Sequence, residues 1–391
     1  MSTLNKIYYG SAGTGKTREA TREAVNIISK SNGFNFKIED STYPQILETF
    51  KSYATLPKID VTDKKLLQDI QNPNINIEKK EYLGYSKQDL NNMKDDVAEY
   101  RKKFMSYPLV ETVTFHPSYS YQDFVEGITI DTEETQKNTE TVKDIIYTVK
   151  DGIFKKICEK ARNNKSKGYN YVLIIDEINR GDISSIFGEL FTLLEDNRRE
   201  GESEELSINL PYSKDVDGNP KKLTVPSNLY IVATMNTVDK SIALIDVALR
   251  RRFDFIEMKP EPELLKDIKI EDINLLAMLE AINNRITILK NEHYQIGHSY
   301  FLKIETFDDL KRVMTKNIIP LLQEYFYDDW KSICAVLNQP YEKSNNENGL
   351  FDIKKADDKM FSAEFKDLIE FNNKKIVTIR DFDAQDIKTI Y

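Results

Sequence analysis

The 391-residue sequence has few cysteines and no long hydrophobic run, and each absence excludes a class of protein. Cys158 and Cys334 lie far apart and lack CxxC spacing, so neither a disulfide scaffold nor a structural zinc site is expected. No apolar segment approaches the roughly 20 residues of a membrane span, and no signal peptide is recognisable. We therefore expect a cytoplasmic protein that does not enter a membrane.

The sequence also lacks an excess of positive charge. It has 55 lysines and arginines against 64 aspartates and glutamates, which gives a net charge of −9. Proteins that bind duplex DNA over a large surface usually carry a basic patch and a net positive charge. Any contact with DNA is therefore expected to be local, as in the pore of a ring, or to be made by a partner protein.

A complete phosphate-binding loop is present close to the first residue of the sequence. The segment reads Gly-Ser-Ala-Gly-Thr-Gly-Lys-Thr and matches the pattern G-x-x-x-x-G-K-[ST] throughout. Glycines in such a loop let backbone N–H groups face the phosphates, and the next helix directs its positive end toward them. The predicted nucleotide-binding residues are Gly10, Ser11, Ala12, Gly13, Thr14, Gly15, Lys16 and Thr17. Lys16 is expected to reach the β- and γ-phosphates, and Thr17 to bind Mg²⁺.

Apolar runs that alternate with helical patterns predict an α/β domain. The predicted strands lie at residues 7–9, 111–115, 171–175, 229–234 and 253–258. Two of these runs are unbroken, as is typical of parallel strands that are buried on both faces. Helices are predicted at residues 18–30 and 183–198. Strands that alternate with helices indicate a parallel sheet with right-handed crossovers.

Two hairpins and a polar segment are predicted to interrupt this domain. Apolar ends at residues 128–130 and 145–149 predict one hairpin, and Asp217-Gly218 predicts a second. Residues 31–108 are rich in Asn, Lys and Asp, and we interpret them as an insertion.

The pattern changes near residue 259, where buried strand runs give way to amphipathic helices. Helices are predicted at residues 273–290 and 307–327, with Pro320 kinking or restarting the second. The predicted domains are therefore an α/β nucleotide-binding domain at 1–258 and a smaller helical domain with a C-terminal tail at 259–391.

Acidic and amide residues follow the two predicted buried strands, where α/β proteins bind their ligands. Asp176 ends the first run and is expected to hold Mg²⁺, while Glu177 is expected to activate the attacking water as a general base. Asn236 follows the second run and is a candidate for orienting that water or contacting the γ-phosphate. Asp239 is expected to help position Asn236 or the water.

Arginines occur at two places where a phosphoryl-transfer site requires positive charge. Arg180 lies three residues after Glu177, and Arg250-Arg251-Arg252 precedes the last predicted strand. An arginine delivered by a neighbouring subunit accelerates phosphoryl transfer by roughly 10³- to 10⁵-fold. An oligomer with active sites at its subunit junctions would use such residues.

Several segments together resemble the McrB family of AAA+ proteins, the motor subunits of modification-dependent restriction systems. The most specific are Asp176-Glu-Ile-Asn-Arg180, Met235-Asn-Thr-Val-Asp-Lys-Ser241 and Ala248-Leu-Arg-Arg-Arg-Phe253, and further similar segments lie at 116–124, 150–154, 296–301 and 320–326. The resemblance implies an AAA+ P-loop NTPase sheet with hairpin insertions and a helical lid. It also implies a homo-hexamer that uses GTP rather than ATP, with Mg²⁺, and a McrC-like endonuclease partner.

The resemblance also implies roles for individual residues. Asn179 and Arg180 correspond to a pair that acts on the nucleotide of the neighbouring subunit, and Asn236 corresponds to the sensor. Arg251 and Arg252 lie where the family has further finger or sensor arginines. His298 and Ser299 lie in the lid motif, with their role left open. The phosphate loop does not distinguish guanine from adenine, so the GTP preference comes from the resemblance alone.

The sequence departs from the family pattern in two respects. Lys240 replaces an arginine, which keeps the charge but not the bidentate fork. Because the phosphate loop begins at residue 10, we expect no folded module before it and therefore no amino-terminal DNA-reading domain. The insertion at 31–108 or another polypeptide is the candidate replacement.

The favoured interpretation is a hexameric NTPase that drives DNA translocation or remodelling for a nuclease partner in restriction and antiviral defence. One alternative is a MoxR-like AAA+ ATPase that remodels proteins. A second is a scaffold that binds nucleotide without hydrolysing it, against which the presence of Glu177 and Arg180 argues.

Overall fold

The computed structural model describes residues 3–31, 109–137, 140–238, 247–342, 349–355 and 375–391. The insertion predicted at 31–108 lies, after Ser31, outside these described residues, and so does Asp239. The chain forms two compact units. The first consists of residues 1–9, 16–235 and 240–256, and the second of residues 10–15, 236–239 and 257–391.

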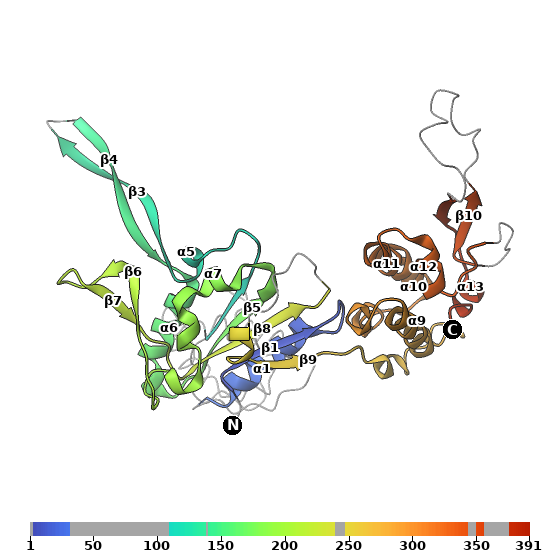
Figure 1. Cartoon of the computed structure of the whole chain (residues 1–391), viewed down its shortest axis with the longest axis horizontal. Coiled ribbons are helices and arrows are strands. Elements are labelled where there is room, and N and C mark those ends of the chain that lie inside the picture. Colours follow the sequence, from blue (N-terminus) through green and yellow to red (C-terminus); the bar gives the residue numbers. More distant parts are fainter. Residues whose placement is uncertain (1–2, 32–108, 138–139, 239–246, 343–348, 356–374) are drawn as a thin grey trace, which may run out of the picture. The chain divides into compact units, whose positions relative to one another are not determined.

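A five-stranded sheet in the order β2-β5-β8-β1-β9 is the centre of the first unit (Figure 1). Its strands are β1 (Asn5–Gly10), β2 (Val110–Thr114), β5 (Tyr171–Asp176), β8 (Leu229–Asn236) and β9 (Asp254–Glu257). Strand β5 pairs in parallel with β2 on one side and β8 on the other. The first five residues of β5 are buried, as expected for a strand covered on both faces. The predicted parallel sheet is thus confirmed.

Short helices cover this sheet, and one predicted helix is wrong. The helices are α1 (Lys16–Ser29), α5 (Tyr121–Phe124), α6 (Ile153–Asn163), α7 (Ile183–Phe187) and α8 (Val247–Arg250). Instead of one helix at 183–198, α7 ends at Phe187 and two 3₁₀ helices follow, Gly188–Leu193 and Asp196–Arg198. Gly188 has a φ of +50°, a conformation that interrupts a right-handed helix.

Both predicted hairpins are present, and both project from the first unit (Figure 1). Strand β3 (Glu126–Lys137) pairs with β4 (Glu140–Asp151), and β6 (Ile208–Lys214) pairs with β7 (Pro220–Leu223). Their roots are joined by the fully buried carboxylate of Glu126, which accepts hydrogen bonds from Lys155 Nζ at 2.9 Å and Ser213 N at 3.0 Å. Burial acts to raise the pKa of Glu126, but the hydrogen bonds from Lys155 and Ser213 bring this pKa below its ordinary value.

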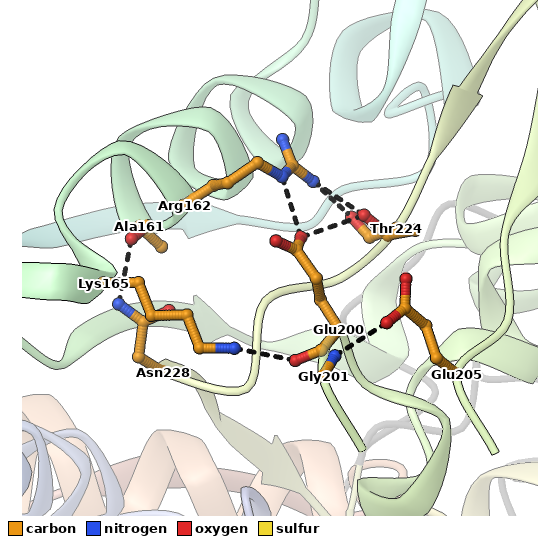
Figure 2. Close-up of polar contacts among 8 residues, drawn as sticks. All are labelled: Ala161, Arg162, Lys165, Glu200, Gly201, Glu205, Thr224 and Asn228. Carbon is orange, nitrogen blue, oxygen red and sulfur yellow. Dashed lines mark hydrogen bonds and ion pairs between the residues drawn. The ribbon is translucent and has the colours of Figure 1, made fainter. Parts of the chain in front are cut away.

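A second polar cluster connects α6 to the segments that flank the β6–β7 hairpin (Figure 2). The Glu200 carboxylate accepts hydrogen bonds from Arg162 Nε at 2.8 Å and Thr224 Oγ1 at 3.0 Å. Lys165 Nζ donates to the Glu200 carbonyl oxygen at 2.8 Å, and Asn228 Nδ2 donates to the carbonyl oxygen of Ala161 at 2.9 Å. These contacts fix the chain before it enters β8, the strand that ends in Asn236.

The second unit is mainly helical, with an apolar core. Its helices are α9 (Leu275–Leu289), α10 (Phe307–Val313), α11 (Ile319–Phe326), α12 (Trp330–Val336) and α13 (Ala384–Lys388). The helix predicted at 307–327 is interrupted by a π-helical turn, Met314–Ile318. Pro320 has no N–H, and its ring excludes a regular hydrogen bond to the preceding turn, which explains the interruption.

The C-terminal segment adds a small sheet that the sequence did not predict. Strands β10 (Phe351–Lys355) and β11 (Lys375–Ile379) pair antiparallel, and Phe351 contacts Trp330 of α12 edge to face. Among the described helices, none combines the length and apolar character that a membrane crossing requires.

Candidate nucleotide-binding and catalytic site

The phosphate loop forms the connection between β1 and α1. Gly13 and Gly15 have φ angles of +77° and +83°, which a residue with a side chain adopts only with strain. Within the loop, the Thr14 hydroxyl donates to the Ser11 carbonyl oxygen at 3.0 Å. Lys16 and Thr17 are the first residues of α1, so the positive end of a helix follows the loop directly.

Asp176 lies at the carboxyl end of β5, as predicted, where it contacts two hydroxyl groups. Thr17 Oγ1 is 3.3 Å from Asp176 Oδ1, and Thr234 Oγ1 of the neighbouring strand β8 forms a short hydrogen bond to the same oxygen. Hydroxyl and carboxylate oxygens are the ligands that Mg²⁺ prefers in sites that also bind phosphates. Thr17 and Asp176 therefore fit a Mg²⁺ ion bound together with a nucleotide.

Glu177 follows Asp176 in a left-handed conformation, with φ 53° and ψ 47°. Its backbone N–H donates to Thr234 Oγ1 at 3.1 Å, so one hydroxyl contacts both the carboxylate of the predicted Mg²⁺ ligand and the backbone of the predicted general base. Thr234 was missed by the sequence analysis. A polar residue inside an otherwise apolar, buried strand was the signal that could have found it, because a buried hydroxyl requires a hydrogen-bond partner.

The predicted pair Asn179 and Arg180 lies in a 3₁₀ turn directly after Glu177. Asn179 is buried, whereas about half of the Arg180 side chain is exposed. Arg180 Nε lies 3.6 Å from Glu177 Oε2 of the same chain. In this arrangement the guanidinium is close to the carboxylate of Glu177, the predicted general base, and is also accessible to solvent.

Asn236 is the last residue of β8, two residues after Thr234, and its side-chain oxygen accepts a hydrogen bond from the N–H of Val238 at 3.3 Å. The structure thus has the predicted sensor residue at the end of the strand beside β5. Asp239 lies outside the described residues, so its predicted role remains a prediction.

The arginine triplet begins at the last residue of α8 and continues toward β9, and its three members differ in surroundings. Arg250 lies over the ring of Phe255, with 5.5 Å between Cζ and the ring centroid. Arg251 is exposed. Arg252 is mostly buried and forms an ion pair with Glu195 at 3.0 Å.

In the second unit, the lid motif around His298 contacts the phosphate loop. The N–H groups of Gly297 and Ser299 donate to the carbonyl oxygens of Ala12 and Gly13, at 2.9 and 3.0 Å. His298 is buried, and its Nδ1 accepts a hydrogen bond from the N–H of Glu261 at 3.0 Å. His298 and Ser299, whose role the sequence left open, thus belong to a segment that supports the loop.

Glycine is required at Gly297 for this contact. A Cβ atom there would lie 1.9 Å from the carbonyl carbon of Gly13, and the ring of Tyr300 occupies the space that a side chain on Gly13 would need. The segment is held from the other side by Asn283 of α9, which exchanges two hydrogen bonds with the backbone of Ile296, at 2.7 and 2.9 Å.

A pocket lies beside the start of the phosphate loop in the second unit. Its lining consists of Gly10, Ser11, Glu257, Met258, Lys259, Pro260, Glu292, His293 and Gln295. It combines the apolar side chain of Met258 with the carboxylates of Glu257 and Glu292, the ammonium group of Lys259, an imidazole and an amide. Within the described part of the chain, no cluster of three or more acidic, His or Cys side chains forms a metal site.

Comparison with known proteins agrees with this fold. The family model "AAA domain (dynein-related subfamily)" matches residues 93–253, and the model "McrB, alpha-helical lid domain" matches residues 274–334. The chain is 36% identical over 244 residues to the type IV methyl-directed restriction enzyme EcoKMcrB subunit of Escherichia coli, covering 56% of this chain and 48% of that protein.

A second relative is the type II restriction enzyme BsuMI component YdiS of Bacillus subtilis. It is 30% identical over 187 residues, which cover 41% of this chain and 52% of that protein. The chain thus matches about half the length of each relative. The AAA domain, the lid model and these identities lead to one assignment: the chain is an AAA+ protein of the McrB family.

Proposed function

We propose that the chain is the GTP-hydrolysing motor subunit of a restriction system. The observation that carries this proposal is a set of three contacts. The Thr234 hydroxyl donates to the Asp176 carboxylate and accepts from the backbone N–H of Glu177, and the Thr17 hydroxyl at the start of α1 contacts the same carboxylate. Asp176 and Thr17 would bind Mg²⁺, which when bound neutralises charge on the β- and γ-phosphates. Lys16 contacts the same phosphates, and Glu177 accepts a proton from the attacking water.

Turnover is proposed to require a ring of six copies, in which arginine side chains of one subunit contact the phosphates of the nucleotide bound to the neighbouring subunit. Arg180 and Arg251 are exposed enough to reach across a subunit junction. Asn179 is buried in the same 3₁₀ turn as Arg180 and is proposed to act with it on the nucleotide of the neighbouring subunit. Asn236, with Asp239, orients the attacking water. In domain terms, residues 1–258 bind and hydrolyse the nucleotide, and residues 259–391 form the lid.

The preference for GTP is proposed to reside in the pocket beside Gly10 and Ser11. The Glu292 carboxylate can accept hydrogen bonds from N1–H and the N2 amino group of guanine, and adenine offers neither donor on that edge. Glu292→Ala is therefore expected to raise KM for GTP and to leave KM for ATP unchanged. An equal change for both nucleotides would refute this assignment.

Both relatives are named as parts of restriction enzymes, which supports a separate McrC-like endonuclease as the partner. In this scheme the chain supplies movement and the partner cleaves DNA. Given the net charge of −9, contact with DNA would come through the partner or the pore of the ring.

The proposal is tested by measuring GTP and ATP hydrolysis, with Mg²⁺, for the wild type and two variants. Lys16→Ala is expected to abolish turnover. Glu177→Gln is expected to retain nucleotide and to accumulate as a ring in mass photometry. Normal turnover in either variant would overturn the site. ATP hydrolysis without GTP hydrolysis, in a protein that binds no nuclease, would favour the protein-remodelling alternative.

A further inference from the structure

The Arg252 side chain is held within its own subunit. Its Nη2 lies 3.0 Å from Glu195 Oε1, and its guanidinium lies over the Phe191 ring, 5.9 Å from the centroid. Only 13% of the Arg252 side chain is exposed. An arginine with a carboxylate partner and an aromatic face has its charge satisfied locally, and it must give up both contacts before it can reach another subunit.

Arg251 has different surroundings, although it is the adjacent residue. Its side chain is exposed, and among the described residues it forms no ion pair with a carboxylate and lies over no aromatic ring. The two arginines predicted as further finger or sensor residues therefore differ in their surroundings. One is fixed to the body of its own subunit, and the other is presented to the outside.

The main chain at Arg252 is fixed as well, by Asn5 at the start of β1. Asn5 Nδ2 donates to the carbonyl oxygens of Leu194 and Arg252, at 2.8 and 2.9 Å. Its Oδ1 accepts a hydrogen bond from Nη2 of Arg199 at 2.7 Å, and both side chains are fully buried. Asn5 thus joins the segment that carries Glu195 to the segment that carries the arginine triplet.

We propose that Glu195 and Asn5 are positioning residues, which hold Arg252 so that Arg251 is presented to the nucleotide of the neighbouring subunit. This inference rests on the proposed function, because it assigns the finger among the arginines of the same site. Arg252 then acts as an anchor, and Arg251 is the catalytic residue. A fixed anchor beside a finger reduces the freedom that the finger loses when it reaches the phosphates.

The anchor is tested with Glu195→Gln, which removes the charge and keeps the size of the side chain. A misplacement of about 1 Å in a catalytic group costs on the order of 100-fold, so a 10- to 100-fold loss of kcat for GTP is expected, with KM unchanged. Arg198→Ala is the matched control, because Arg198 Nε contacts the other oxygen of Glu195 at 3.3 Å. It removes an ion pair of the same carboxylate and is expected to leave kcat unchanged.

Lysine substitutions separate an anchor from a finger. Arg252→Lys keeps a charge for Glu195 and should lose much less activity than Arg252→Ala. Arg251→Lys loses the planar fork and should be nearly as inactive as Arg251→Ala. The opposite order, or wild-type kcat in Glu195→Gln, would overturn the inference. A loss in Arg198→Ala equal to that in Glu195→Gln would also overturn it, since it would indicate general disturbance.

Mixed assemblies test where the defect is expressed. Glu195→Gln subunits combined with Lys16→Ala subunits should hydrolyse GTP well above the sum of the two variants alone. The reason is that an intact Arg251 then comes from the Lys16→Ala neighbour. If mixtures with Lys16→Ala subunits recovered activity for Arg251→Ala but not for Glu195→Gln, the positioning role of Glu195 would be refuted, and the ring with neighbour-supplied arginines would stand. Absence of recovery in Arg251→Ala and in Arg180→Ala would refute the ring with neighbour-supplied arginines.

Discussion

Replacing Thr234 by valine tests whether one hydroxyl positions both the proposed Mg²⁺ ligand Asp176 and the proposed general base Glu177. Thr234 Oγ1 donates to Asp176 Oδ1 and accepts from the backbone N–H of Glu177 at 3.1 Å. Valine has nearly the same shape, so it removes both hydrogen bonds with little change in packing. Thr234 is 1% exposed, and water therefore cannot replace the missing hydroxyl without a rearrangement.

The size of the effect follows from these two contacts. Leaving buried hydrogen-bonding groups without a partner costs about 1–3 kcal/mol, which corresponds to a roughly 5- to 150-fold change in rate if it appears in the transition state. Two consequences are expected in Thr234→Val. The Mg²⁺ concentration for half-maximal activity should rise because Asp176 is no longer oriented, and kcat should fall because Glu177 is free to turn.

The assay is GTP turnover over a Mg²⁺ titration, with thermal unfolding followed in parallel. Thr234→Ser keeps the hydroxyl and is the control, so it should stay within a few-fold of the wild type. If Thr234→Val showed wild-type kcat and wild-type Mg²⁺ dependence, the hydroxyl would not organise the site. If the serine variant lost as much as the valine variant, packing rather than hydrogen bonding would be responsible.

Three further predictions concern the support of the fold and the loop. Glu126→Gln places an amide among hydrogen-bond donors and should cost about 3 kcal/mol of unfolding free energy at pH 7. Because folding lowers the pKa of Glu126, this difference should be constant above pH 4.5 and shrink as the pH falls through the lower folded-state pKa, as measured by urea unfolding. Gly297→Ala should impair nucleotide binding in a fluorescence titration, since its Cβ would overlap the carbonyl group of Gly13. Burial raises the pKa values of Cys158 and Cys334 to about 12, so neither thiol should react with a thiol reagent at pH 8 until the protein unfolds.

The sequence predicted the central fold because its signals are local. A phosphate loop specifies its own backbone conformation through its glycines, and unbroken apolar runs specify buried strands without reference to the rest of the chain. Asp176 and Asn236 were assigned from their place after such runs, and the structure has them at the ends of β5 and β8. Asp239 and the insertion lie outside the described residues and stay predictions.

The supporting residues could not be predicted, because their partners are distant in sequence. Asn5 contacts the carbonyl oxygen of Leu194, 189 residues away, and Thr234 contacts Asp176 across 58 residues. A single sequence without an alignment contains no information about such pairs. Only the cost of burying an unpaired polar group indicates that partners must exist, and it does not indicate which residues they are.

The wrong helix at 183–198 and the missed contact between Glu195 and Arg252 have the same cause. In one continuous helix, Phe191 and Glu195 would be one turn apart on a shared face, and Glu195 would serve as a surface residue paired along that helix. In the structure the helix breaks at Gly188, and the backbone of Glu195 is extended, with φ −65° and ψ 137°. The Glu195 side chain therefore does not lie along a helix surface. Glu195 then contacts Arg252 of a different segment, while Arg198 retains the local contact. The interruption at Gly188 thus leaves Glu195, seven residues later, in contact with the segment that carries the proposed finger.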